Sequence, residues 1–425
     1  MKVVVIGAGK MGLPLACALA EGGARVVACD VKAHLVAGIN RGECPIDEPG
    51  VAEVLPRLVQ SGRLSASTHT AAAVSESEVV VVIVPVLLTP DKRADTANIE
   101  SVSRQIAEGM KPGTLVSYET TLPLGGTRRL GSLLESRGLR AGVDFDLAFS
   151  PERVKSGMVC ARLRQNPKVV GGITPKSAER AADFYRQYLG APVIVVGSLE
   201  AAELVKLAGM AYRDVNIALA NELAHYTVAA GVDFQVVRAA ANTDGEAHLL
   251  EPGIGVGGHC TPVYPYFLIQ EGQRLGVATN LVETGRHINE EQPARILDRL
   301  EREWGPVRGA RTLILGLGFR PRVKEHTCSP AFVLRDELTR RGAEVRLHDP
   351  LYTPEEIHSL GFIPGALAPP LWPEVVILNT AHPDYARLDF ASMAGTVKVV
   401  VDGRDLWPPE KVRQAGIAYL GVGRP

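Results

Sequence analysis

The feature that most constrains the fold is a strand–turn–helix–strand unit at the start of the chain. A β-branched run, Lys2–Ile6, leads directly into the glycine turn Gly7–Gly12, which has the pattern GxGxxG. A helical pattern, Leu13–Glu21, and a second apolar run, Arg25–Cys29, follow, and the second run ends at Asp30. This order of strand, glycine turn, helix, strand and acid predicts a parallel α/β sheet that binds a dinucleotide.

The glycines and the acid have separate roles in this prediction. Glycines admit a pyrophosphate to the helix N-terminus, where backbone N–H groups and the helix dipole favour negative charge. Asp30 would bind the ribose hydroxyls and repel the extra phosphate of NADP, so we expect NAD, although Lys32 follows closely. The alternative, a glycine-rich turn without a ligand, fits the complete unit less well. The predicted cofactor-binding residues are Gly7, Gly9, Lys10, Met11, Gly12, Asp30, Lys32, Pro85, Val86, Thr121 and Glu152.

Composition narrows the classes of protein that fit. A chain of 425 residues predicts two or three domains, and 46% hydrophobic residues provide a sizeable core. The net charge of −1 argues against nucleic-acid or membrane-surface partners, which need a basic patch. The six cysteines show no CxxC or zinc-type spacing, so we predict no metal site. With no export signal or membrane-length apolar run, we expect a cytoplasmic protein with reduced thiols.

Two polar residues follow later strands of the same predicted sheet. Apolar runs at Glu78–Val84, Gly113–Ser117 and Asp146–Phe149 continue the strand pattern, and Thr121 and Glu152 follow the last two of these runs. Ligands of open α/β sheets bind at the carboxyl ends of strands, so both residues are predicted near the reactive end of the cofactor. The alternatives are a turn hydroxyl that caps backbone for Thr121 and a first-turn helix carboxylate for Glu152.

One long helix is predicted in the middle of the chain. Residues Glu200–Ala230 contain no proline, and Gly231 ends the pattern. The helix would span about 45 Å, which is longer than one domain needs, so we expect it to connect domains, to pair with a second subunit, or both. Lys206, Met210 and Arg213 share one face of it.

A glycine-rich loop, Pro252–Pro262, carries the candidate nucleophile. Four glycines within six residues precede Cys260 and allow close backbone approach to a ligand. Exposed backbone N–H groups in such a loop would stabilise a thiolate and an oxyanion formed beside it. Taken alone, Cys260 favours the other interpretation, a small buried hydrophobic residue, because most free cysteines are of that kind.

A second strand–glycine–helix unit begins at Arg311–Phe319. A helix is predicted from Pro330 to Arg341 and a strand at Glu344–His348, which ends at Asp349. The predicted fold class is therefore α/β, with two Rossmann-like parallel-sheet domains joined by a helical middle region with one long central helix. The predicted domains are 1–198, which binds NAD, 199–305, which is helical and carries the cysteine loop, and 306–425, which binds the nucleotide.

Motifs along essentially the whole chain resemble those of nucleotide-sugar 6-dehydrogenases, nearest the branch that acts on UDP-N-acetylhexosamines. SPERV, YRDVNIALANE and GVGGHC point to that branch. The matching segments are Gly7–Pro14, Asn40–Gly50, Thr121–Gly125, Ser150–Val154, Asn166–Gly172, Ala202–Glu222, Pro252–Pro262, Gly316–Pro321 and Asp402–Leu406.

The resemblance implies a four-electron oxidation of carbon six of the sugar by NAD. Cys260 would capture the aldehyde as a thiohemiacetal, which is then oxidised to a thioester and hydrolysed to the carboxylate. Covalent capture prevents loss of the aldehyde between the two oxidations. Lys206 would stabilise the oxyanion and assist proton transfer, and Glu152 and Thr121 would position water and handle protons.

The resemblance also implies a nucleotide-sugar site, and the long middle helix favours a homodimer or a dimer of dimers. Motif positions place Phe319 and Arg404 at the nucleotide sugar, and Gly257 in the lining of the sugar site. The predicted substrate-binding residues are Glu152, Arg153, Val154, Lys206, Met210, Arg213, Asn216, Leu249, Gly253, Gly257, Tyr264, Phe319, Arg320 and Arg404.

Five positions depart from the family pattern. Tyr264 stands where the family usually has an aspartate that works with the lysine, and Met210 stands in place of an asparagine. Glu246 and Thr327 each replace an arginine, and Arg320 replaces a lysine but keeps the charge. Tyrosine is not a base at neutral pH, and methionine donates no strong hydrogen bond, so these changes alter the surroundings of the substrate.

These departures leave two alternatives beside the leading hypothesis. One is a divergent member that performs a single two-electron oxidation, because thioester hydrolysis would lose a helper at Tyr264. The other is a noncatalytic protein that binds NAD or a nucleotide sugar and regulates a pathway.

Overall fold

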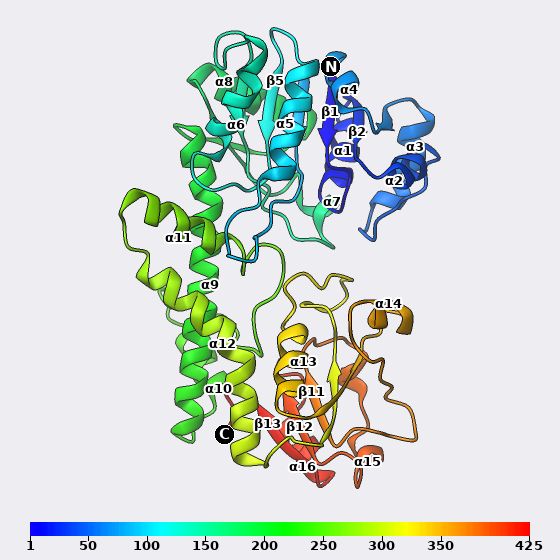
Figure 1. Ribbon diagram of the computed structural model, residues 1–425, viewed down its shortest axis with the longest axis vertical. Coiled ribbons are helices and arrows are strands. Elements are labelled where there is room, and N and C mark those ends of the chain that lie inside the picture. The colour runs from blue at the N-terminus through cyan, green and yellow to red at the C-terminus, as the bar shows by residue number, and fades with distance from the viewer. The chain divides into compact units, whose positions relative to one another are not determined.

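The computed structural model describes residues 1–425, which form two compact units (Figure 1). The first unit comprises residues 1–209 and 266–277, and the second comprises 210–265 and 278–425. The predicted α/β class, with two parallel-dominated sheets and one long middle helix, is confirmed. The domain boundaries at 198/199 and 305/306 stay predictions.

The first unit contains an eight-stranded sheet with the order β3-β2-β1-β4-β5-β6-β7-β8. Neighbouring strands are parallel except β6 and β7, which pair antiparallel. The strand order reverses between β1 and β4: strands β1 to β3 extend to one side of the sheet, and β4 to β8 extend to the other. Open α/β sheets bind ligands at such a position. The strands are β1 (Lys2–Ile6), β2 (Arg25–Cys29), β3 (Leu64–Ser67), β4 (Val79–Val82), β5 (Leu115–Tyr118), β6 (Asp146–Phe149), β7 (Lys168–Gly172) and β8 (Val193–Val195).

Buried β-branched strands and small-residue helices form the core of this unit. The strand residues Val3, Val5, Val79 and Val81 pack with the alanines and leucines of α1. Thr174 caps α8 by accepting a hydrogen bond from Ser177 N. The helices are α1 (Gly12–Glu21), α2 (Ala33–Asn40), α3 (Val51–Gln60), α4 (Thr70–Ser75), α5 (Ala97–Gly109), α6 (Gly126–Leu134), α7 (Val159–Arg162) and α8 (Pro175–Tyr188).

The long helix α9 spans Leu199–Ala229, one residue earlier at each end than the sequence predicts (Figure 1). The boundary between the two units falls inside it, between Gly209 and Met210. No helix of the chain combines the length and apolar character needed to cross a membrane.

The second unit contains a five-stranded, all-parallel sheet with the order β10-β9-β11-β12-β13. Its two faces bury separate apolar clusters, one with α13 and the other with Trp407 and Phe390. The strands are β9 (Arg311–Leu315), β10 (Glu344–His348), β11 (Val375–Leu378), β12 (Val399–Asp402) and β13 (Ala418–Gly421). The further helices are α10 (Phe234–Ala241), α11 (Tyr264–Leu275), α12 (Asn280–Glu303), α13 (Pro330–Arg340), α14 (Pro354–Ser359), α15 (Phe390–Met393) and α16 (Pro409–Gln414).

Candidate active site

The first glycine turn leaves room for a ligand at one position only. A Cβ on Gly7 would lie 2.6 Å from the Ile83 carbonyl oxygen, and one on Gly12 would lie 1.7 Å from the Gly7 carbonyl oxygen. Gly7 also has a φ of +101°. The fold itself therefore requires these two glycines. A Cβ on Gly9 would contact nothing within 4 Å, so the space above Gly9 is open to a ligand.

The groups around this turn fit a dinucleotide. Helix α1 begins at Gly12, and no side chain caps its N-terminus at Met11, so its first N–H groups and dipole face the turn. Asp30 Oδ2 accepts a hydrogen bond from Ala8 N at 3.0 Å, and Oδ1 accepts one from Lys32 N at 3.0 Å. The half-buried carboxylate is thereby fixed at the end of β2 and retains lone pairs for ribose hydroxyls. Lys10, Pro85 and Val86 lie in loops that follow β1 and β4.

The strand ends of the same sheet hold the predicted polar residues. Thr121 is buried after β5. The neighbouring Thr120 makes the backbone-capping contact, since its hydroxyl donates to the Val84 carbonyl at 2.8 Å. Glu152 lies in the loop after β6 rather than in a helix, and its Oε1 accepts a hydrogen bond from Val154 N at 2.6 Å. The guanidinium of Arg153 donates to the Pro167 carbonyl.

Lys206 lies beside Glu152. Its ammonium donates to the Glu152 backbone carbonyl at 2.7 Å, and the side chain is buried. A lysine on a helix is more often solvated, so burial against the Glu152 loop gives Lys206 a defined orientation. Its catalytic role stays a prediction.

Three further charged or polar side chains complete a buried cluster around Glu152. Lys168 Nζ lies 2.6 Å from Glu119 Oε2 and 3.4 Å from Glu152 Oε2. The Tyr185 hydroxyl donates to Glu119 Oε1 at 2.7 Å. The sequence predicted none of Glu119, Lys168 and Tyr185 as site residues, although Lys168 lies in the matched segment 166–172.

The pKa values of the two carboxylates of this cluster, Glu119 and Glu152, are shifted in opposite directions. Burial raises the pKa of Glu119 and outweighs the effect of Lys168. Burial also acts to raise the pKa of Glu152, but Lys168, the Val154 N–H and Lys206 together hold it below its ordinary value. Burial acts against the charge of Lys168, yet its two carboxylate neighbours raise its pKa overall. Glu152 is therefore kept as an anion and can accept a proton.

The glycine loop lies in the second unit. Side chains of that unit pack so closely against it that a residue larger than glycine would clash. A Cβ on Gly257 would lie 2.5 Å from Phe319 Cβ, and one on Gly258 would lie 3.0 Å from the Phe319 ring. Arg404 donates to the Gly255 carbonyl at 3.2 Å and to the Asn379 carbonyl at 2.7 Å. Burial lowers the pKa of Arg404 to about 10, which leaves it charged at neutral pH. Phe319 and Arg404 thus hold the loop, and their predicted contacts with the nucleotide sugar stay predictions.

A buried polar network from α9 and α12 fixes the start of this loop at Gly253. The Asn221 side-chain oxygen accepts from Gly253 N at 2.9 Å, and Gln292 donates to the Gly253 carbonyl at 2.9 Å. Asn221 also donates to Asn289 at 3.0 Å, and Asn289 in turn donates to the Asp214 carboxylate at 2.9 Å. An ion pair of 2.6 Å between Arg286 and Asp214 completes the network.

Cys260 lies near the end of the loop, four residues before α11 begins at Tyr264. The Cys260 carbonyl accepts a hydrogen bond from Tyr264 N at 3.0 Å, so the cysteine precedes the first helical turn. The buried Tyr264 places its hydroxyl 3.0 Å from His259 Nδ1. Tyr264 is therefore joined to the histidine that precedes Cys260, the predicted nucleophile.

The other predicted substrate residues of this unit lie on α9 and in the segment before the loop. Asn216 donates to the His248 carbonyl at 2.7 Å and accepts from Leu250 N at 2.9 Å. Leu249 N donates to the Asn242 side chain at 2.8 Å. Met210 and Arg213 are half-buried one to two turns earlier on α9. Asn216 thus positions the segment that leads into the glycine loop.

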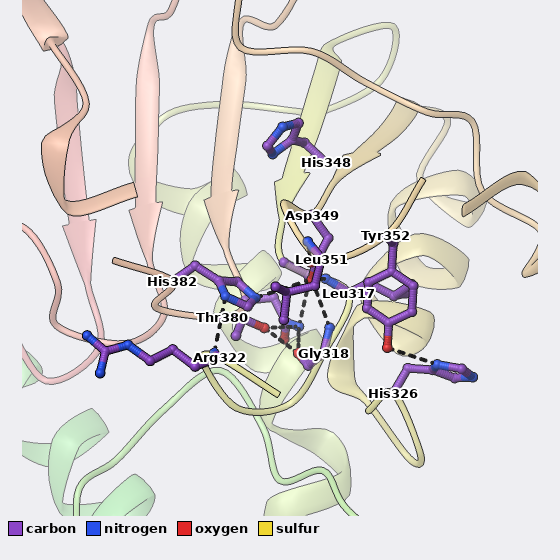
Figure 2. A network of polar contacts seen from close by, with 12 residues as sticks. Leu317, Gly318, Arg322, His326, His348, Asp349, Leu351, Tyr352, Thr380 and His382 are labelled. Atoms are coloured by element: carbon purple, nitrogen blue, oxygen red, sulfur yellow. Dashed lines mark hydrogen bonds and ion pairs between the residues drawn. The ribbon is translucent and has the colours of Figure 1, made fainter. Parts of the chain in front are cut away.

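The second glycine turn is filled by groups of the chain itself (Figure 2). Asp349 Oδ2 accepts from Leu317 N at 2.6 Å and from Gly318 N at 3.2 Å, and Oδ1 accepts from Leu351 N at 2.8 Å. His382 Nε2 lies 3.3 Å from the same carboxylate, and His382 Nδ1 accepts from Arg322 N at 3.4 Å. The His382 ring therefore lies between the Arg322 N–H and the Asp349 carboxylate.

Three regions of the chain match the domains of one enzyme family. Residues 1–189 match the NAD binding domain of the UDP-glucose/GDP-mannose dehydrogenase family, residues 200–291 its central domain and residues 313–409 its UDP binding domain.

Similar proteins act on different nucleotide sugars. The UDP-N-acetyl-D-mannosamine dehydrogenase of Pyrococcus horikoshii is 32% identical over 100% of this chain and 99% of its own length. The NDP-N-acetyl-D-galactosaminuronic acid dehydrogenase of Ralstonia nicotianae is 30% identical, with 96% of this chain and 97% of that protein covered. The solved structure of a UDP-glucose dehydrogenase from Pyrobaculum islandicum aligns with a TM-score of 0.90 at 31% identity, covering 100% of this chain and 98% of that chain.

Proposed function

Because this chain belongs to the UDP-glucose/GDP-mannose dehydrogenase family and is an NAD-dependent nucleotide-sugar dehydrogenase, we propose that it oxidises carbon six of a UDP-N-acetylhexosamine to a carboxylate. The observation that carries the proposal is the open cradle at Gly9 beside Asp30, combined with a cysteine at the end of a rigidly held glycine loop. The open space at Gly9 would bind the cofactor, and the cysteine would form a covalent intermediate.

The residues of the chain divide the reaction into two oxidations and one hydrolysis. NAD⁺, when bound, supplies the hydride acceptor for each oxidation. The alcohol loses a hydride and a proton to give an aldehyde, and the Cys260 sulfur adds to this aldehyde to form a thiohemiacetal. The second hydride loss gives a thioester, and water cleaves the carbon–sulfur bond to release the carboxylate and the thiol. The covalent bond retains the aldehyde between the two oxidations.

Proton handling is assigned to Glu152, Lys206 and Thr121. Glu152 is an anion in a buried site, which suits the removal of a proton from the alcohol or from the attacking water. Lys206 is a buried donor at the Glu152 loop and would stabilise an oxyanion as charge develops. The Thr121 hydroxyl would orient the water.

A second candidate is a single two-electron oxidation that stops at the aldehyde or thiohemiacetal. The observation that favours it is Tyr264, whose hydroxyl bonds to His259 at the position where the family usually has an aspartate. A neutral phenol supplies less help to an attacking water than a carboxylate does. Slow hydrolysis alone would leave a thioester after two oxidations, so the two-electron outcome requires that the phenol also slows proton loss from the thiohemiacetal.

We also propose a homodimer formed through α9. Three large apolar residues at seven-residue spacing, Tyr212, Leu219 and Tyr226, are 56%, 45% and 72% exposed. This spacing places them on one helix face and forms the kind of stripe that another helix covers. Light scattering should give twice the chain mass for the wild type, and a smaller mass for Tyr226→Glu. A wild-type mass of one chain would contradict the dimer.

The substrate proposal is tested with a panel of UDP-sugars and NAD, with the product identified by mass. We expect NADH and the uronate mass with a UDP-N-acetylhexosamine, and slower turnover with UDP-glucose. Cys260→Ala should still bind NAD but release no acid. Acid production by Cys260→Ala at the wild-type rate would contradict the covalent route, and the absence of NADH with every sugar would contradict the proposed activity.

A further inference from the structure

The one antiparallel strand pair of the large sheet brings a lysine to the edge where the parallel strands end. Strand β6 runs toward this edge and β7 runs away from it, so the first residue of β7, Lys168, lies where β6 finishes. The register pairs Phe149 with Gly171 and Ala148 with Gly172. Continued by three residues, the same register sets Glu152 opposite Lys168, in agreement with their 3.4 Å contact.

Lys168 is shared by two carboxylates. The distance from Lys168 Nζ to Glu119 is 2.6 Å, and that to Glu152 is 3.4 Å. Glu119 is 1% exposed and Lys168 is 4% exposed, so solvent does not screen these charges. Glu119 is itself anchored by the Tyr185 hydroxyl, which also contacts Ser117 at 2.9 Å.

From this arrangement we propose that Lys168 is a positioning residue that keeps Glu152 anionic and correctly oriented for proton transfer, and that Glu119 competes for the same ammonium. The inference deepens the proposed function, because it rests on the role of Glu152 as a proton acceptor. Lys168 contacts Glu152 through its carboxylate, whereas Lys206 contacts it through the backbone carbonyl. The two lysines therefore act on different groups of one residue.

The charged and titratable groups near Glu152 come from four elements. Glu119 follows β5, Lys168 begins β7, Tyr185 lies on α8 and Lys206 lies on α9. Burial opposes the anionic form of Glu152, while the cations and the Val154 N–H favour it, and Glu119 competes for the Lys168 ammonium at a shorter distance. Removing Lys168 and removing the charge of Glu119 should therefore move the titration of Glu152 in opposite directions.

The first experiment compares pH profiles of kcat for the wild type, Lys168→Met and Glu119→Gln with saturating NAD and UDP-sugar. Glu152 must be ionised to accept a proton, so a higher pKa moves the acid limb to higher pH. Lys168→Met should shift this limb upward by about one pH unit or more and lower kcat at pH 7 roughly 100-fold, with a smaller change in KM. Glu119→Gln should shift the limb downward.

Two matched variants separate positioning from folding. Lys168→Arg keeps the positive charge, so its kcat should be no less than about a tenth of the wild-type value. Lys176→Met removes an exposed lysine in the first turn of α8 and should leave the profile unchanged. Limb shifts in the same direction for Lys168→Met and Glu119→Gln, or equal losses in Lys168→Met and Lys168→Arg, would overturn the proposal.

A measurement without substrate keeps this inference separate from the proposed activity. In Lys168→Met, the Glu152 carboxylate lacks its side-chain cation, so the protein should lose stability as the pH rises from 5 to 8, about the range over which a raised carboxyl pKa titrates. Adding Glu152→Gln should restore part of the loss in the denaturation midpoint at pH 8, because Glu119 has lost the same ammonium, and should change the midpoint little at pH 5. No restoration would overturn the inference even if the wild type oxidises sugars.

Discussion

The two glycine turns of the molecule begin alike and differ in what occupies them. Each follows the first central strand of its sheet, and each faces an aspartate at the end of the neighbouring strand, Asp30 or Asp349. In the first turn α1 starts at Gly12, and the space above Gly9 is open. In the second turn α13 starts only at Pro330, where the Ser329 side chain caps it.

The second turn is closed by the protein itself. The Asn379 side chain donates to the Gly316 carbonyl at 2.9 Å and to the Gly318 carbonyl at 3.0 Å. Asp349 is 3% exposed and is bound by three backbone N–H groups and by His382. The two turns therefore differ in the open space above the glycine and in the number of backbone groups that bind the acid. We propose that Asp30 binds the cofactor and that Asp349 stabilises the fold.

The largest expected contrast is between Asp349→Asn, which should affect stability, and Asp30→Asn, which should affect NAD binding. Asp349→Asn should lower the free energy of unfolding by about 3 kcal/mol, because it replaces a buried carboxylate that accepts hydrogen bonds from three backbone N–H groups. Its NAD affinity, measured by calorimetry at a temperature where it is folded, should match that of the wild type. A stability loss below about 1 kcal/mol, the size of an ordinary surface change, would remove the distinction.

Gly9→Val tests the open space in the first turn. A Cβ at this position meets no atom within 4 Å, and the side chain would occupy the path of the pyrophosphate, so NAD affinity should fall more than about 100-fold, or ~2.7 kcal/mol. The melting temperature should stay near that of the wild type. The matched control is Gly318→Ala, whose Cβ would lie 3.2 Å from the Glu325 carbonyl oxygen. This control should lose stability and keep NAD binding, and the reverse result would contradict the assignment of the two turns.

Asp30→Asn should have a smaller effect on binding. Loss of the charge weakens hydrogen bonds from ribose hydroxyls, and we expect an affinity loss of about tenfold, or ~1.4 kcal/mol. Discrimination against NADP should also decrease, because the repulsion of its extra phosphate is removed. Unchanged NAD and NADP dissociation constants would show that Asp30 does not face the ribose.

The smallest effect concerns the pH dependence of stability. Burial acts to raise the pKa of Asp349, but His382 and the backbone N–H groups hold it below its ordinary value. A lowered folded-state pKa contributes stability above the unfolded value of about 3.9, and this contribution is lost as the pH falls through the folded value. The stability gap between wild type and Asp349→Asn should be constant from about pH 6 to 8 and narrow below about pH 4. A gap that widens in acid would contradict this sign.

Local patterns in the sequence predicted most of the fold. Strands at 2–6, 25–29, 146–149 and 344–348 have the predicted bounds, and α9 differs by one residue at each end. These elements depend on apolar runs and on glycine signals that lie within the segment itself. The first dinucleotide unit was predicted for the same reason.

The buried cluster around Glu152 could not be predicted in this way. Its geometry depends on the direction of pairing between β6 and β7, which brings Lys168 beside Glu152 across the sheet. Strand direction follows from tertiary packing rather than from the alternation of residues, so Lys168 resembled an ordinary strand residue. Likewise, the difference between Asp30 and Asp349 lies in distant partners such as His382, which neither local motif contains.

The most direct test of the proposed reaction is the ratio of NADH formed to nucleotide sugar consumed, measured together with the product mass. Our account predicts two NADH for each UDP-N-acetylhexosamine and a uronate as the product, with Cys260 free again after turnover. One NADH for each sugar, with an aldehyde product, would contradict the four-electron reaction and support the two-electron alternative.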